Sequence, residues 1–326
     1  MIISVLLIIV GFILLIKGAD FLVIGASGVA KKLKISEMVI GLTIVAMGTS
    51  MPELMVSLTS AMNGYSDISL GNVVGSNLVN VLFILGLCAI IKNLKISKES
   101  RKIDIPLSLL ATILLFFLCL NGSSAKIITR PEGIILLVIF IIYILYLIKN
   151  ARKIEKDEPS TSINNSNISE KENSKKFILN CAKIIVGIIA LKFGADFVVN
   201  NAVNVAQIMG ISERIIGVTI IAIGTSLPEL VASVTAVLKN ENDLAVGNIV
   251  GSNIFNILLI LGVSSAISPI NYSLSYNFDM VLLIAISILL AIFPFIGKEK
   301  YSLERYEGIL FCLIYLAYIL MLIFAV

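Results

Sequence analysis

The residues best suited to chemistry are two glutamates set in apolar sequence. Glu53 follows IGLTIVAMGTSMP and Glu229 follows IGVTIIAIGTSLP, and neither has a Lys or Arg within nine residues on either side. A carboxylate near the middle of a membrane span costs roughly 2.5–3.5 kcal/mol on insertion scales, so two of them imply a neutralising cation. Because the chain has no histidine and only four scattered cysteines, hard oxygen ligands for Na⁺ or Ca²⁺ are indicated rather than a transition-metal site.

Small polar residues accompany both glutamates and recur at spacings of three and four. They are Ser50, Ser76 and Asn80 in the first half, and Ser226, Ser252 and Asn256 in the second. This spacing places side chains on one face of a helix. Such stripes are often only packing devices, and S-x-x-E is also a capping box that restarts a helix. The glutamates favour a cation-binding face over either structural reading alone.

A proline directly before each glutamate predicts a break in the helix. Pro52 and Pro228 have no backbone N–H, so the carbonyls four residues earlier lose their helical partner. We therefore expect backbone oxygens over 46–49 and 222–225 to become available. Inside a membrane such oxygens are tolerated where they line a cavity or bind something. Carboxylate, carbonyl and hydroxyl oxygens together suit Ca²⁺, which takes 6–8 oxygen ligands.

The elements that must position these residues are transmembrane helices. Hydrophobic residues make up 58% of the 326 residues and charged residues 14%, which is far outside the range of soluble domains. Apolar runs of about 20 residues recur along the chain, and they are too long and too apolar for barrel strands. The ten predicted spans are 2–30, 36–62, 68–91, 105–121, 132–149, 177–208, 212–238, 244–268, 279–297 and 306–326.

An internal repeat organises these spans into two halves. KGADFLV (17–23) returns as FGADFVV, and LGNVVGSNLVNVLFILG (70–86) as VGNIVGSNIFNILLILG, each 176 residues later and without a gap. We predict an all-α membrane protein with a five-helix repeat at 1–150, a linker at 151–175 and a second five-helix repeat at 176–326. Because five is odd, the second repeat is inverted. Inverted repeats place the substrate site near the bilayer midplane, between the halves.

Charge asymmetry predicts the orientation in the membrane. Alternate sides of the ten spans carry 19 and 3 of the Lys and Arg residues, and the basic side faces the cytoplasm. Both termini then lie outside the cell membrane and the 150–175 linker lies in the cytoplasm. This linker is charged, rich in Ser and Asn and free of aromatics, which is typical of a flexible segment. The basic residues are explained by topology, so no nucleic acid is implied.

The GAD motifs contain a second acidic pair, Asp20 and Asp196. Lys17 lies three residues before Asp20, and Lys192 lies four residues before Asp196. This spacing favours an ion pair along one helix face near the end of each span. A part in helix movement is the alternative.

The doubled motifs GTSMPEL with GNVVGSNLVN and GTSLPEL with GNIVGSNIFN resemble the two α-repeats of the cation/calcium antiporter superfamily, in its Na⁺/Ca²⁺ exchanger branch. The resemblance covers nearly the whole chain outside the linker. It implies that Glu53 and Glu229 are the central Ca²⁺ ligands, helped by the backbone oxygens of Thr49 and Thr225. The Na⁺ sites that it implies are lined by Ala46, Thr49 and Ser76, and by Ala222, Thr225 and Ser252.

One position departs from the resembled pattern. Several exchangers of that branch carry an aspartate where this chain has Asn256, opposite Asn80. The pocket then has two carboxylates rather than three, which leaves the Na⁺ to Ca²⁺ ratio and any dependence on K⁺ open.

We therefore expect an antiporter that exchanges Ca²⁺ for Na⁺ by alternating access. The resemblance implies that one cavity takes Na⁺ and Ca²⁺ in turn, and that the long first and sixth helices slide over a more static bundle. The alternative of the same fold is an exchanger of Ca²⁺, or another divalent cation, for protons. A channel is disfavoured by the inverted halves, and an intramembrane hydrolase by the absence of a histidine base. The expected partners are Ca²⁺, Na⁺ and the lipid bilayer, with no enzymatic activity, no cofactor and no obligate protein partner.

Overall fold

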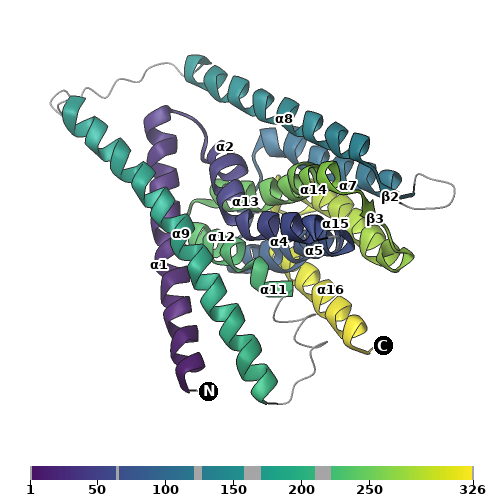
Figure 1. Cartoon of the computed structure of the whole chain (residues 1–326). Helices are drawn as coiled ribbons and strands as arrows, with labels where there is room; N and C mark the ends of the chain where they lie inside the picture. The colour runs from purple at the N-terminus through teal and green to yellow at the C-terminus, as the bar shows by residue number, and fades with distance from the viewer. Residues whose placement is uncertain (1, 64–65, 121–126, 158–169, 210–221, 325–326) are drawn as a thin grey trace.

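The computed structural model describes residues 2–63, 66–120, 127–157, 170–209 and 222–324 of the chain. Nearly all of them are helical, and the fold is that of an all-helical, polytopic membrane protein (Figure 1). The elements before the linker are α1 (Ile2–Leu33), α2 (Glu37–Ile40), η1 (Gly41–Val45), α3 (Ala46–Thr49), α4 (Met51–Met62), α5 (Ser66–Leu78), η2 (Val79–Leu85), α6 (Gly86–Ile91), β1 (Leu94–Lys95), η3 (Ser100–Asp104), α7 (Ile105–Leu120), β2 (Ile127–Ile128) and α8 (Arg130–Asp157).

The elements after the linker follow a similar order. They are α9 (Glu170–Ile208), α11 (Ala222–Thr225), α12 (Leu227–Leu238), α13 (Asn242–Ile254), η5 (Phe255–Ile260), α14 (Leu261–Ile267), β3 (Ile270–Asn271), η6 (Leu274–Tyr276), α15 (Asn277–Ile296), β4 (Ser302–Leu303) and α16 (Arg305–Phe324). Since α8 continues to Asp157 and α9 begins at Glu170, both helices extend into the predicted linker, whose centre at 158–169 lies outside the described residues.

Within the described residues, eight helical stretches are long and apolar enough to cross a membrane. Glu37–Thr49 and Met51–Met62 form a ninth span if the pair, which is bent by 49°, is taken as one. The remaining predicted span, 212–238, lies partly outside the described residues, and its described part is α11 and α12. The count of ten spans and the inverted orientation of the repeats therefore stay predictions.

The long helices α1 and α9 pack side by side and form a layer next to the other helices (Figure 1). Their contact is close because glycines face backbone. A Cβ at Gly18 would lie 2.9 Å from the backbone N of Leu191, and a Cβ at Gly187 would lie 2.7 Å from the carbonyl O of Gly18. Small residues of this kind let helix backbones approach each other in lipid, where no hydrophobic force drives the helices together. The helices α1 and α9 thus form one closely packed pair.

The remaining helices form a core around α5–η2–α6 and α13–η5–α14. Of an 18-residue stretch in Asn242–Ile267, 94% is buried inside the protein. Both runs pass through a π-helical segment, η2 and η5 respectively. Each π segment changes the phase of the helix, as π-bulges do at many functional sites.

The predicted breaks before the two glutamates are present. Ser50, with φ −83° and ψ 9°, separates α3 from α4, and Ser226, with φ −90° and ψ 9°, separates α11 from α12. In each case the proline occupies the first turn of the following helix, where a missing N–H costs nothing. Proline therefore starts a new helix at these points instead of only kinking an old one.

Two short antiparallel ladders join the two halves of the chain. β1 pairs with β4, with Leu94 opposite Leu303, and β2 pairs with β3, with Ile128 opposite Ile270. All four of these residues are fully buried. Each ladder thus links a strand from before the linker to one from after it.

Candidate cation site

The two glutamates lie in the first turns of α4 and α12, directly after the helix breaks. Glu53 and Glu229 are each only 1% exposed. The backbone N–H of each glutamate contacts its own carboxylate, at a point where a helix has no internal acceptor for that group. The positive end of the helix dipole stabilises negative charge there. The two carboxylates are close enough to repel each other.

Each glutamate is contacted by a serine from the opposite half of the chain. Ser50 Oγ donates to Glu229 Oε1 at 2.8 Å, and Ser226 Oγ lies 3.4 Å from Glu53 Oε1. Ser252 Oγ adds a contact of 3.4 Å to Glu229 Oε1. The S-x-x-E pairs therefore do not act as local capping boxes, and no side-chain cap bond forms at Ser50 or Ser226. The two halves are interlocked at the site.

Two asparagine pairs cross the interface in the same reciprocal way. Asn80 Nδ2 donates to Asn253 Oδ1 at 2.9 Å, and Asn256 Nδ2 donates to Asn77 Oδ1 at 2.9 Å. The roles of Asn77 and Asn253 were missed in the sequence, although both stand at equivalent places in the repeated GSN motif. Each of these bonds uses one of the two N–H groups on the amide of Asn80 or Asn256, and the amide oxygens of both residues keep no partner in the described part of the chain.

Four buried oxygens at this site have no hydrogen-bond partner within the described part of the chain. They are Glu53 Oε2, Glu229 Oε2, Asn80 Oδ1 and Asn256 Oδ1. Buried polar atoms are rarely left without a partner, because the loss of water is then not compensated. Two carboxylate and two amide oxygens, related in pairs by the repeat, suit a hard cation.

The remaining residues of the predicted site differ in their contacts and burial. Thr49 Oγ1 contacts Asn248 Oδ1 at 3.1 Å and the Ala46 carbonyl O at 3.3 Å, and Ser76 is buried. Thr225 is half-buried at the end of α11, and the side-chain surroundings of Ala222 lie outside the described residues. The expectation that the Ala46 carbonyl is free is wrong, because it also accepts from Ser50 N at 3.0 Å.

Further asparagines fasten the glutamate helices to their neighbours. Asn72 Nδ2 donates to the Glu53 carbonyl O at 3.1 Å and to Ser57 Oγ at 2.9 Å. At the equivalent place, Asn248 Nδ2 donates to Ser233 Oγ at 2.9 Å. These bonds hold α4 against α5 and α12 against α13, and so fix where each glutamate lies.

Of the two ion pairs predicted for the GAD motifs, one is present as predicted and the other has a different partner. Lys192 Nζ lies 3.3 Å from Asp196 Oδ2, as expected along one helix face. Asp20 Oδ1 instead pairs at 3.0 Å with Lys239 Nζ, which follows α12. Sequence spacing could not indicate this partner, because the two residues belong to different halves.

The donor set limits the charge that the site offers. In the described part of the chain, no three His, Cys, Asp or Glu groups gather as a metal site. Among the described residues, a cation between the halves therefore meets the two carboxylates of Glu53 and Glu229, with neutral hydroxyl and amide oxygens around them. The fold and this site define the chain as a membrane protein of the cation antiporter class.

Comparisons with known proteins give the family. The family model described as sodium/calcium exchanger protein matches residues 3–149 and 180–324, and the chain belongs to this family. The putative antiporter CaxA of Alkalimonas amylolytica is 37% identical over 321 residues, which is 98% of this chain and 97% of that protein. The sodium/calcium exchanger MaX1 of Methanosarcina acetivorans is 33% identical and is covered over 99% of both chains.

Solved structures agree with this assignment. The sodium-calcium exchanger NCX_Mj, soaked with Na⁺ and Ca²⁺, superposes with a TM-score of 0.81 at 32% identity, and the match covers 98% of each chain. The family assignment predicted from the doubled GTSxPE and GNxVGSN motifs is thus confirmed, and with it membership of the cation/Ca²⁺ antiporters.

Proposed function

We propose that this protein exchanges Ca²⁺ for Na⁺ across the cell membrane, and that both ions use the site between Glu53 and Glu229. The observation that carries the proposal is the set of four unpartnered, buried oxygens on Glu53, Glu229, Asn80 and Asn256. A site that holds a cation only during transport needs such oxygens, whereas a purely structural cluster would satisfy them internally.

Charge limits which ions fit. With both glutamates ionised the site carries −2, so one Ca²⁺ or two Na⁺ leave it neutral. A third Na⁺ would be held by neutral oxygens, for which the amide oxygens of Asn80 and Asn256 are available. Backbone oxygens of Thr49 and Thr225 complete the ligand set that we propose, together with the hydroxyls of Ser50, Ser226, Ser76 and Ser252, and with Ala46 and Ala222 lining the Na⁺ positions.

Access to the site alternates in this proposal through the layer formed by α1 and α9. The two helices are joined by backbone contact and face lipid, so they can shift together against the buried core. We place both termini outside the cell and the end of α1 near Leu33 in the cytoplasm, in agreement with the distribution of Lys and Arg. Ten spans in two inverted repeats complete the proposed topology.

A transport assay tests the coupling ion. Purified protein in proteoliposomes loaded with Na⁺ should take up ⁴⁵Ca²⁺ when external Na⁺ is removed, at constant pH and with or without K⁺. Uptake driven by a pH gradient and indifferent to Na⁺ would instead show the proton-coupled alternative, which the carboxylate pair could also serve. Uptake that needs neither gradient would contradict both.

A further inference from the structure

The end of α1 near Leu33 is joined to the core by a polar cluster far from the cation site. Ser27 Oγ lies 2.8 Å from Glu37 Oε1 and 2.9 Å from Glu241 Oε1. Lys31 Nζ lies 3.8 Å and 3.7 Å from the same two oxygens. We name these four residues, Ser27, Lys31, Glu37 and Glu241, the latch, because two belong to α1 and two to the core.

The two contacts of the Ser27 hydroxyl require one more hydrogen than the serine itself can supply. A serine hydroxyl has one hydrogen to donate, and an ionised carboxylate can only accept. Ser27 can therefore bond to both glutamates only if one of them carries a proton. Burial raises the pKa of Glu241, but hydrogen bonds from Glu37 and Ser27 and the charge of Lys31 lower it below its ordinary value. Glu241 is then the ionised partner, and Glu37 is the proton carrier.

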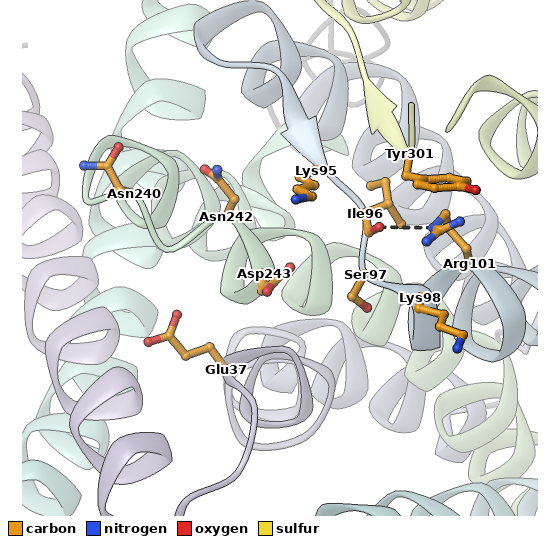
Figure 2. Close-up of a pocket in the computed structure, with 10 residues that line it drawn as sticks. All are labelled: Glu37, Lys95, Ile96, Ser97, Lys98, Arg101, Asn240, Asn242, Asp243 and Tyr301. Atoms are coloured by element: carbon orange, nitrogen blue, oxygen red, sulfur yellow. Dashed lines mark hydrogen bonds between the residues drawn. The ribbon is translucent and has the colours of Figure 1, made fainter. Parts of the chain in front are cut away.

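The latch can exchange its proton with water. The side chains of Glu37 and Glu241 are each 21% exposed, and Glu37 lines a cleft of about 400 Å³. Figure 2 shows Glu37 and Asp243 on one side of this cleft and Lys98 and Arg101 on the other. Further charged groups near the latch are Lys92, which contacts Asn240 beside Glu241, Lys95 and Glu99 from the segment before α7, and the Asp20–Lys239 pair.

The latch is connected to the cation site through the turn that joins α12 and α13. Lys239 and Glu241 lie in this turn and contact Asp20, Ser27 and Lys31 of α1. Glu229 lies on α12, and Asn256 lies in η5, which directly follows α13. A shift of α1 against the core must therefore break these contacts before the site can change its access.

We propose that the latch is a cytoplasmic proton site, in which a proton on Glu37 holds α1 against the core and slows exchange. The effect on exchange rests on the proposed function, whereas the proton site itself does not. When the latch opens, Glu37 and Glu241 separate and regain the ordinary glutamate pKa of about 4.3. The closed latch binds a proton more tightly than the open one, so it is favoured at low pH and lost as the cytoplasmic pH rises.

Infrared spectroscopy of the full protein in lipid tests the proton directly. We expect wild type, with saturating Ca²⁺, to show a protonated carboxyl band near neutral pH that disappears as the pH is raised. The band should be missing in Glu37→Gln and in Glu241→Gln, where an amide supplies the hydrogen. Glu99→Gln, an exposed glutamate nearby, is the matched control and should keep the band. The same band in all variants would overturn the proposal.

A transport assay tests the effect of the latch on exchange. In proteoliposomes with a fixed Na⁺ gradient, wild-type exchange should fall about fivefold as the cytoplasmic pH is lowered from about 8 to about 6, a coupling of ordinary size. Glu37→Gln should be slow and nearly independent of pH, while Glu99→Gln should follow wild type. If Glu37→Gln kept the wild-type pH profile, the latch would not control exchange. If no variant exchanged Ca²⁺ for Na⁺, the proposed function would fail and the infrared result would still decide on the proton.

Discussion

The α1–α9 layer and the helical core are built in opposite ways. Only 22% of an 18-residue stretch in Lys175–Ile208 is buried, against 94% in Asn242–Ile267. The layer is held by glycine against backbone, with few polar contacts to the core outside the latch. The core is held by serines and asparagines that reach across the two halves, at Ser50, Asn77 and Asn253.

This difference indicates that the core is the rigid part of the molecule and that the α1–α9 layer is the part able to move. Reciprocal hydrogen bonds fix the geometry of the core, because breaking one leaves a buried polar atom without a partner. Packing between small residues tolerates a shared displacement, because it has little directional preference. The site can thus keep its oxygens in place while the layer beside it moves.

The largest effect is expected from the core. Glu53→Gln or Glu229→Gln should reduce Ca²⁺ exchange about 100-fold or more with the protein still folded, because loss of a charged partner costs about 3 kcal/mol. The measurement is ⁴⁵Ca²⁺ uptake together with size-exclusion profiles, and Glu99→Gln serves as an active control. Robust uptake by either variant would remove the glutamates from the ion path.

The next effect concerns the layer. Gly18→Ala should lower the unfolding temperature, because its Cβ would lie 2.9–3.0 Å from atoms of α9, and overpacking typically costs 1–3 kcal/mol. Gly75→Ala is the matched control, since a Cβ there meets nothing within 4 Å and alanine favours the helix by roughly 0.5–1 kcal/mol. Equal stability of the two variants would contradict close packing of α1 on α9.

A smaller effect is expected at the amide oxygens. Asn256→Asp adds a third carboxyl near Glu53 and Glu229, and repulsion from like charges raises the pKa of such a group. We expect new pH dependence of exchange and a changed reversal potential. Patch recordings or proteoliposome assays at several pH values measure both, with Asn256→Ala as the uncharged comparison. An unchanged pH profile and an unchanged reversal potential would place Asn256 outside the ion path.

The smallest effect is expected at the linker. Replacing 158–169 by a Gly/Ser segment of equal length should leave exchange within about twofold of wild type, because its composition is that of a flexible connector. The variant is compared with wild type at equal protein density in proteoliposomes. Complete loss of exchange would assign the segment a role in regulation or assembly.

The sequence allowed the paired glutamates, the helix breaks and the family to be predicted, because all three depend on local motifs that occur twice. It could not show that Ser50 contacts Glu229 and Ser226 contacts Glu53, because a capping box and a contact across the halves share one pattern. The structure decides between them, since each serine lies near the glutamate of the other half.

The asparagine pairs and the partner of Asp20 were missed for related reasons. Asn77 lies one residue after Ser76, off the stripe that regular helical spacing selects, and η2 changes the helical phase from Val79 onward. The π-helical segment η1 changes the helical phase before Glu53 in the same way, and Thr43 of η1 lines an apolar pocket with Met47 and Phe140. Lys239 lies far along the chain from Asp20, where local spacing carries no information.

The two strand ladders bear on how the chain is assembled. β1 can pair only after β4 at Ser302–Leu303 has been synthesised, and β2 only after β3 at Ile270–Asn271 has been synthesised. Both ladders therefore form late in synthesis of the chain. Such long-range contacts form late in folding and are slow to find. The first half must therefore stay in the bilayer as an incomplete intermediate, with Glu53 lacking its partners from the second half. This intermediate persists beyond translation of the linker, until β3 at Ile270–Asn271 and β4 at Ser302–Leu303 have been made.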